Sequence, residues 1–185
     1  EKRKNWNGLI SGFSASDLVF LDESGCNTDM TRRYAYSLGG SRAVDSAPLS
    51  KPKNTTILPS IQLDGTLRYT TFSGGTTVER FKRYLETDLL PHLNGNSVLI
   101  MDNMKSHHAK AVRNLLDSSG VRYIYLPPYS PDLNPIEKLW SKVKSFLRKF
   151  KARTLDALPN AIQNAFHSVT ISDCSGWFRF CGYAL

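Results

Sequence analysis

The amino-acid sequence predicts an α/β or α+β domain with a mixed sheet, because strand-like runs come first and then alternate with helical patterns. The length of 185 residues is enough for one domain with a sizeable core and is short for two. Neither an internal repeat nor a low-complexity tract interrupts these patterns. We therefore expect a single domain.

The predicted strands are short runs of apolar or β-prone side chains that end at polar or turn-forming residues. They cover residues 17–22, 55–63, 66–72, 97–102 and 121–126, with a further short strand expected at 34–38. The dipeptide Asp64-Gly65 separates two of these runs. It predicts a hairpin, because Gly after Asp accepts the positive φ of a tight turn.

The predicted helices are marked by apolar residues at intervals of three and four. The first has capping-box spacing from Thr76 to Glu79 and stops at Pro91, and the second begins at Ser106 and ends near Asp117. Two further helices cover residues 136–150 and 155–166. In the helix over 136–150, Trp140 shares the apolar stripe and is expected in the core.

Net charge, cysteine spacing and the lack of long apolar runs limit the kinds of partner and compartment expected for the chain. A net charge of +8 and a pI near 9.5 favour a polyanionic partner such as nucleic acid, with a merely soluble basic protein as the alternative. The three cysteines lack CxxC spacing, so neither a disulfide framework nor a zinc site is indicated, and a reducing compartment is expected. No apolar run approaches the ~18 residues that would cross a bilayer, and no signal peptide opens the chain.

The first residues suggest a piece of a longer protein. The chain begins with the charged stretch Glu1-Lys2-Arg3-Lys4 and without an initiating Met. Residues 1–16 are polar and punctuated by Gly and Ser, so we expect a linker there and a domain over residues 17–185.

Three carboxylates are candidates for a site. Asp22 and Asp102 each end a strand-like apolar run, where open α/β sheets place ligand-binding groups, although either could simply be a polar strand terminus. Glu137 lies at the start of the helix over 136–150. Spacing alone slightly favours a capping role for it, with Asn134 as the N-cap and Pro135 at the first helical position. Oxygen ligands suit hard divalent cations such as magnesium.

The segment before Glu137 favours a place for this residue in the site over a capping role. Residues 126–135 contain four prolines, which stiffen the chain at the start of the helix. The stretch Leu126-Pro-Pro-Tyr-Ser-Pro-Asp-Leu-Asn-Pro-Ile-Glu-Lys-Leu-Trp140 resembles the signature of DDE transposases of the mariner-like superfamily, particularly their bacterial insertion-sequence branch. Leu21-Asp22-Glu23-Ser24 is similar to the first-Asp motif of that family. Met101-Asp102-Asn103 followed by His107-His108 is similar to its second, and the resemblance extends to Tyr183.

The resemblance implies a ribonuclease H-like fold, a five-stranded mixed sheet flanked by helices. It assigns catalysis and metal binding to Asp22, Asp102 and Glu137, whereas Glu23 and Asp132 do not match catalytic positions. It implies two magnesium ions, with manganese as a substitute, and the hypothesis places Asp22 between both ions, about 3.5–4 Å apart.

The reaction implied by the resemblance is cleavage of DNA at transposon ends by water, followed by attack of the freed 3′-hydroxyl on target DNA. The N-terminal DNA-binding region of the family would precede residue 17 and is missing here. A homodimer is expected of the full-length protein, without a membrane partner. The expected location is the bacterial cytoplasm at the nucleoid, or the nucleus in a eukaryote.

Basic residues on the helix over 136–150 extend the hypothesis to DNA contacts. No Asp or Glu within residues 138–153 balances its positive face, which favours backbone contact over an ordinary solvated face. The candidate DNA-binding residues are Lys138, Lys142, Lys144, Arg148 and Lys149, continued by Lys151 and Arg153. We do not expect His107 and His108 to bind metal, because magnesium prefers oxygen; a phosphate contact or local packing suits them better.

Two other functions stay open. One is a catalytically silent DNA-binding module derived from a transposase. The other is a structure-specific nuclease of the same fold, which would cut DNA without joining it.

Overall fold

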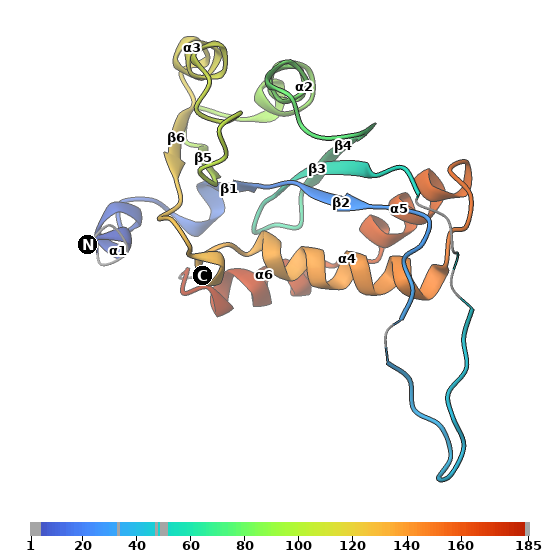
Figure 1. Cartoon of the computed structure of the whole chain (residues 1–185). Coiled ribbons are helices and arrows are strands. Elements are labelled where there is room, and N and C mark those ends of the chain that lie inside the picture. The colour runs from blue at the N-terminus through green and yellow to red at the C-terminus, as the bar shows by residue number, and fades with distance from the viewer. Residues whose placement is uncertain (1–4, 33, 47, 49–51, 184–185) are drawn as a thin grey trace.

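A computed structural model of the chain describes residues 5–32, 34–46, 48 and 52–183. One mixed sheet divides the molecule into layers, with α2 (Val78–Tyr84) and α3 (Lys110–Ser119) on one face. The opposite face carries α4 (Ile136–Phe150), α5 (Ala157–His167) and α6 (Ile171–Phe180), as Figure 1 shows. Two separate apolar clusters of buried side chains fill the two interfaces between sheet and helices.

Six short strands fill five positions across the sheet. They are β1 (Leu18–Leu21), β2 (Ser24–Cys26), β3 (Thr55–Ile61), β4 (Leu67–Ser73), β5 (Val98–Met101) and β6 (Arg122–Tyr125). β4 pairs with β3 along its whole length, so β1 and β2 share the other edge of β3, where their pairing follows one continuous register. β5 and β6 continue the sheet in parallel with β1. The expected five-stranded mixed sheet flanked by helices is confirmed.

The interruption between β1 and β2 falls at Asp22 and Glu23. Side chains alternate along β1, so that Leu18 and Phe20 enter the cluster under α4, while Val19 and Leu21 enter the cluster under α2 and α3. Asp22 therefore returns to the α4 face and Glu23 to the opposite face.

The expected hairpin is present between β3 and β4. Gly65 adopts φ of 87°, and the Asp64 carboxylate accepts a hydrogen bond from the Thr66 N–H at 2.8 Å. These contacts are the reason that the Asp-Gly pair forms a tight turn here.

Several predicted boundaries are wrong. No strand forms at residues 34–38 in the part of the chain that the structure describes; Tyr34, Tyr36 and Leu38 are exposed on a long loop that projects from the body between β2 and β3 (Figure 1). Thr77, and not Thr76, caps α2 by accepting from the Arg80 N–H. Past Tyr84 the helix widens into a π-helical turn, η2 (Leu85–Leu89), and ends in a 3₁₀ turn, η3 (Leu90–His92), whose Pro91 lacks the N–H needed to continue.

The second predicted helix starts later than expected. Residues 105–108 form a turn, and α3 begins at Lys110 with Ala109 as its N-cap, so Ser106 is not the cap and the two histidines are not helical. The C-terminal helix α6 was not predicted from the sequence. It begins with a capping box between Thr170 and Asp173.

Part of the expected linker is structured. Residues Trp6–Ile10 form the short helix α1, and a 3₁₀ turn, η1 (Ala15–Asp17), leads into β1. Trp6 and Ile10 are buried in the cluster under α4, α5 and α6. Residues 1–4 lie outside the described part of the chain. None of the helices it contains is both long and apolar enough to cross a bilayer.

Candidate active site

The two aspartates are neighbours because of strand pairing. β1 and β5 are parallel, with Leu21 opposite Met101, so Asp22 and Asp102 leave adjacent strands at the same level. Alternation along β5 puts Asp102, like Asp22, on the face covered by α4. Both aspartates and Glu137 line one cavity of about 430 Å³ together with the proline-rich segment before α4. The structure therefore places the three predicted carboxylates around one cavity.

Glu137 is positioned by the segment that precedes α4. A 3₁₀ turn, η4 (Pro131–Leu133), leads to buried Asn134, whose side chain accepts a hydrogen bond from the Ile136 N–H at 3.3 Å. The N–H of Asn134, which Glu137 was expected to cap, donates instead to the carbonyl of Pro131 at 3.1 Å. The capping interpretation of Glu137 is therefore wrong, and its exposed side chain is left to the cavity.

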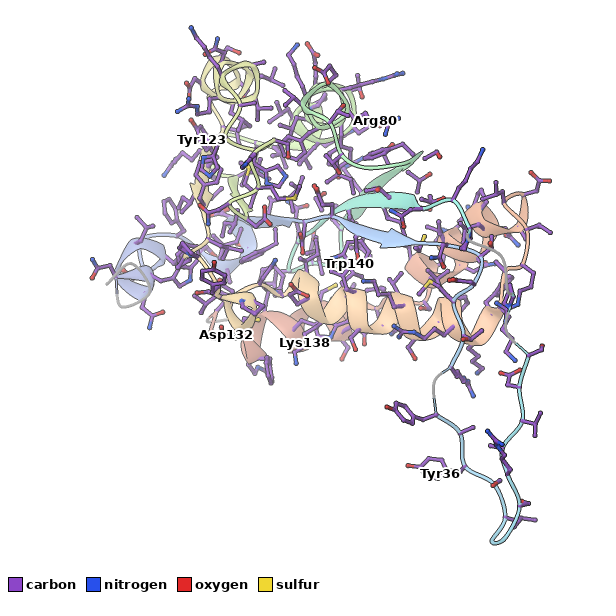
Figure 2. All side chains as sticks on the ribbon, in the orientation of Figure 1. Tyr36, Arg80, Tyr123, Asp132, Lys138 and Trp140 are labelled. Atoms are coloured by element: carbon purple, nitrogen blue, oxygen red, sulfur yellow. The ribbon has the colours of Figure 1, made fainter. Side chains whose placement is uncertain are left out.

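Asp22 is held by two donors. Its Oδ1 accepts from the Glu23 N–H at 2.7 Å, and its Oδ2 accepts from Trp140 Nε1 at 3.3 Å. Trp140 is buried and lies between α4 and the sheet (Figure 2), so its expected place in the core is confirmed. Its hydrogen bond to Asp22 was not foreseen. Burial raises the pKa of Asp22 to about 7; the charges of Asp102 and Glu137 add to this effect, and the two hydrogen bonds oppose it.

Asp102 is held by His107, which is fully buried. The Nδ1 of His107 lies 2.8 Å from Asp102 Oδ1, its Nε2 lies 3.3 Å from Glu23 Oε2, and its ring stacks on Phe81. Burial alone would lower the pKa of His107, but the hydrogen bonds to Asp102 and Glu23 raise it to about 9. With a carboxylate at each nitrogen, the ring is a buried imidazolium that links β1 to β5.

The contact with His107 also shifts the pKa of Asp102. Burial disfavours the charged carboxylate, yet the hydrogen bond from His107 and that from the Met104 N–H hold the pKa of Asp102 below its ordinary value. Local packing was one of the two roles expected for His107 and is confirmed, whereas its complete burial excludes a phosphate contact in this arrangement. His108 stacks on Tyr125 with ring centroids 4.0 Å apart. The link from Glu23 through His107 to Asp102 was missed, although the acidic pair at residues 22–23 is a visible signal for it.

The chemistry of the site fits a hard divalent cation, although the arrangement does not form a ready coordination shell. Within the described residues, no three His, Cys, Asp or Glu side chains lie close enough together to hold a metal ion. Asp22 instead accepts hydrogen bonds from its donors, Asp102 lies against His107, and Glu137 is exposed at the cavity. The pKa of Asp22 is raised chiefly by burial and to a smaller extent by the charges of Asp102 and Glu137, and a bound cation would favour its ionised form.

The basic residues of α4 divide into paired and unpaired groups. Lys142 forms an ion pair with Asp173 of α6 at 2.5 Å, and Lys151 pairs with Asp45, so acidic residues from elsewhere in the chain partly balance this face. Lys138 lies over the ring of Phe180 at 3.7 Å. Lys144 and Arg148 line one surface groove, and Lys149 lines another. The expectation of an unbalanced positive face is therefore wrong at Lys142 and at Lys151.

Carboxylates at the ends of adjacent strands, beside the N-terminus of a helix in a basic protein, are typical of enzymes that act on phosphodiesters with divalent cations. A family model described as DDE superfamily endonuclease matches residues 17–159. The chain therefore belongs to the DDE superfamily of endonucleases.

Among curated proteins, the Tc1 transposase of Caenorhabditis elegans is 30% identical over 97 residues, which are 50% of this chain and 36% of that protein. The chain thus spans about a third of the length of this relative.

Solved structures of Mos1 transposase share the fold. A pre-cleavage Mos1 transpososome matches with a TM-score of 0.80 and 18% identity, over 96% of this chain and 57% of the Mos1 chain. A Mos1 mariner paired-end complex with Mn matches with a TM-score of 0.80 and 21% identity, over 97% and 58% of the two chains. The Mos1 catalytic domain with Raltegravir and Mg matches with a TM-score of 0.69 and 17% identity, over 95% and 82%. The expected ribonuclease H-like fold is confirmed.

Proposed function

We propose that this chain is the catalytic domain of a transposase that cleaves DNA at transposon ends and joins the freed 3′-hydroxyl to target DNA. The convergence of Asp22, Asp102 and Glu137 on one cavity carries the proposal. Membership of the DDE superfamily and similarity to Tc1 transposase support it. The bacterial insertion-sequence branch and the assignment of residues 1–16 to a linker remain predictions.

The metal requirement is part of the proposal. Asp22, Asp102 and Glu137 would hold two magnesium ions, or manganese in their place. Divalent cations bound there would supply activation of the attacking oxygen and stabilisation of the charge on the departing one. Structures of Mos1 transposase catalytic domain with Mg and with Mn support the use of divalent cations.

The residues of the chain orient the acidic groups. The Glu23 N–H and Trp140 fix the two oxygens of Asp22, so that this carboxylate enters the cavity in one orientation. His107 fixes one oxygen of Asp102 and leaves the other available. Glu137 sits on the first turn of α4, where the rigid proline-rich segment sets its backbone position.

DNA is the proposed substrate, as transposon ends and as target. Lys138, Lys142, Lys144, Arg148 and Lys149 are the proposed backbone contacts, and Lys142 is the weakest candidate because it is paired with Asp173. The Mos1 relatives solved as a transpososome and as paired-end complexes support this partner. We also propose a homodimer of the full-length protein, located with its DNA in the nucleoid or the nucleus.

The test measures cutting and joining separately. Supercoiled plasmid is incubated with Mg²⁺ or Mn²⁺ to detect nicking, and an oligonucleotide duplex with a free 3′-hydroxyl is offered with target plasmid to detect joining. Asp22→Asn should abolish both reactions and leave DNA retention in a gel intact. The matched control is Glu79→Gln, which removes an exposed carboxylate of α2 and should behave as wild type.

Each outcome separates the alternatives. Nicking without joining would identify a nuclease of the same fold. DNA binding without nicking, in either metal, would identify a silent DNA-binding module. Nicking that survives Asp22→Asn would exclude this site as the centre of the reaction.

A further inference from the structure

Tyr129 lies at the rim of the cavity that holds the three carboxylates, and neither its backbone nor its side chain is explained by stability. Its φ is +55°, a left-handed conformation that non-glycine side chains rarely adopt. Only one other described non-glycine residue, Lys151, has a positive φ, and it caps the C-terminus of α4, where that conformation is ordinary. Tyr129 belongs to no helix end; it lies in a turn with Pro128, where a positive φ is usually taken by Gly or Asn and not by a bulky ring.

The side chain of Tyr129 gains nothing from the fold. It is 98% exposed, and within the described part of the chain its ring makes no stacking contact and its hydroxyl makes no hydrogen bond. Exposure of a large aromatic group beside a charged site leaves its whole apolar surface in water. An unfavourable backbone conformation that presents an unpacked ring points to function.

The neighbours of Tyr129 hold it in place. Prolines precede it at Pro127 and Pro128, and Pro131 follows. Ser130 is buried, its hydroxyl donates to the Pro128 carbonyl at 3.3 Å, and its own carbonyl accepts from the Leu133 N–H at 3.1 Å. The backbone is therefore fixed on both sides of Tyr129, and the ring is presented from a rigid turn.

We propose that Tyr129 is a stacking platform for a DNA base beside the phosphate that reacts. The inference rests on the proposed function, since it takes DNA as the substrate. Every base offers a π face, and stacking on an aromatic side chain tolerates any sequence. A ring at the rim of the carboxylate cavity would hold an unpaired or displaced base next to the reacting strand and so fix the position of its phosphate.

The test uses two substitutions that separate stacking from backbone geometry. Tyr129→Phe keeps the ring, whereas Tyr129→Gly removes it and at the same time makes the positive φ favourable. If Tyr129 had only a structural role, the glycine variant would match or exceed wild type in every assay. As a platform, it should unfold at the same or a higher temperature yet bind DNA roughly 5- to 150-fold more weakly. Tyr36→Gly, on the projecting loop, is the matched control for loss of an exposed ring.

The contact itself is mapped by photo-crosslinking. An oligonucleotide duplex with a single-stranded end that carries 5-iodouracil is bound in Ca²⁺, irradiated, and the linked peptide is identified by mass spectrometry. We expect a crosslink on Tyr129, kept in Tyr129→Phe and lost in Tyr129→Gly.

The outcomes distinguish this proposal from the proposed function. Wild-type affinity of Tyr129→Gly, with no crosslink at residue 129 of the wild type, would overturn the platform even if DNA is cut. A shift in oligomeric state in place of DNA affinity would also overturn it and assign the ring to a protein contact. A crosslink at Tyr129 in a protein that never cuts DNA would support the platform and remove the catalytic proposal instead.

Discussion

Replacing Asp22 with Asn should stabilise the metal-free protein while it abolishes cleavage. In the folded chain the pKa of Asp22 rises from its ordinary value of 3.8 to about 7, chiefly because of burial, with a contribution from the charges of Asp102 and Glu137. A pKa raised in the folded state makes an acid destabilising once it ionises. Asp22 therefore does not lower the free energy of unfolding below pH 3.8, and it lowers it progressively as the pH rises through about 7.

The size of the effect follows from that difference. One pKa unit corresponds to about 1.4 kcal/mol, so the ionised Asp22 reduces the free energy of unfolding by up to about 4 kcal/mol above pH 7. An Asn retains an oxygen for the Glu23 N–H but offers no second acceptor to Trp140 Nε1, and losing that hydrogen bond costs about 1–2 kcal/mol. We therefore expect a net gain of about 2–3 kcal/mol at pH 8.

The assay is urea unfolding of wild type and Asp22→Asn in EDTA at pH 5 and pH 8. The difference between the two proteins should grow by about 2 kcal/mol toward pH 8, and Mg²⁺ should stabilise wild type more than the variant. Asp29→Asn, which removes an equal charge from the loop after β2, is the control and should show no such growth. An Asp22→Asn variant that is less stable than wild type by the same amount at both pH values would refute the reasoning.

Three further predictions follow from the site. Trp140→Phe should keep the core but release Asp22 Oδ2, so the plasmid-nicking rate should fall while the free energy of unfolding changes by about 1–2 kcal/mol. The pKa of His107 is raised from 6.5 to about 9 in the folded protein. The stabilising contribution of His107 is therefore complete below pH 6.5 and is lost as the pH rises through about 9. His107→Asn should remove this pH dependence from unfolding curves measured between pH 6 and pH 10. Joint replacement of Lys144 and Arg148 by Gln should lower the slope of log affinity for DNA against log salt by about 2. Lys142→Gln should lower this slope less, because Lys142 is paired with Asp173. An unchanged slope after the double replacement would remove α4 from the DNA interface.

Local patterns were sufficient for the parts of the fold that depend on neighbouring residues. The apolar runs ending at Asp22 and Asp102 predict the two strands that carry the aspartates, and their parallel pairing is seen in the structure. The Asp64-Gly65 turn and the stripe on α4 are equally local. These features could be predicted because each depends on the period of one element.

What the sequence did not reveal involves contacts between distant residues. His107 meets Glu23 across 84 positions, and Lys142 meets Asp173 across 31. Trp140 satisfies the apolar stripe of α4 and also donates to Asp22, and its helical position predicts only the first role. The loop at residues 34–38 was mistaken for a strand because it carries Tyr and Leu without a sheet edge to receive them.

The central claim is that Asp22, Asp102 and Glu137 together hold divalent cations. Anomalous diffraction from crystals soaked in Mn²⁺ tests it most directly. We expect manganese peaks bonded to the carboxylate oxygens of all three residues, with the Glu137 side chain turned into the cavity. Peaks bound elsewhere, or a cavity in which Glu137 stays in solvent at saturating Mn²⁺, would contradict the account.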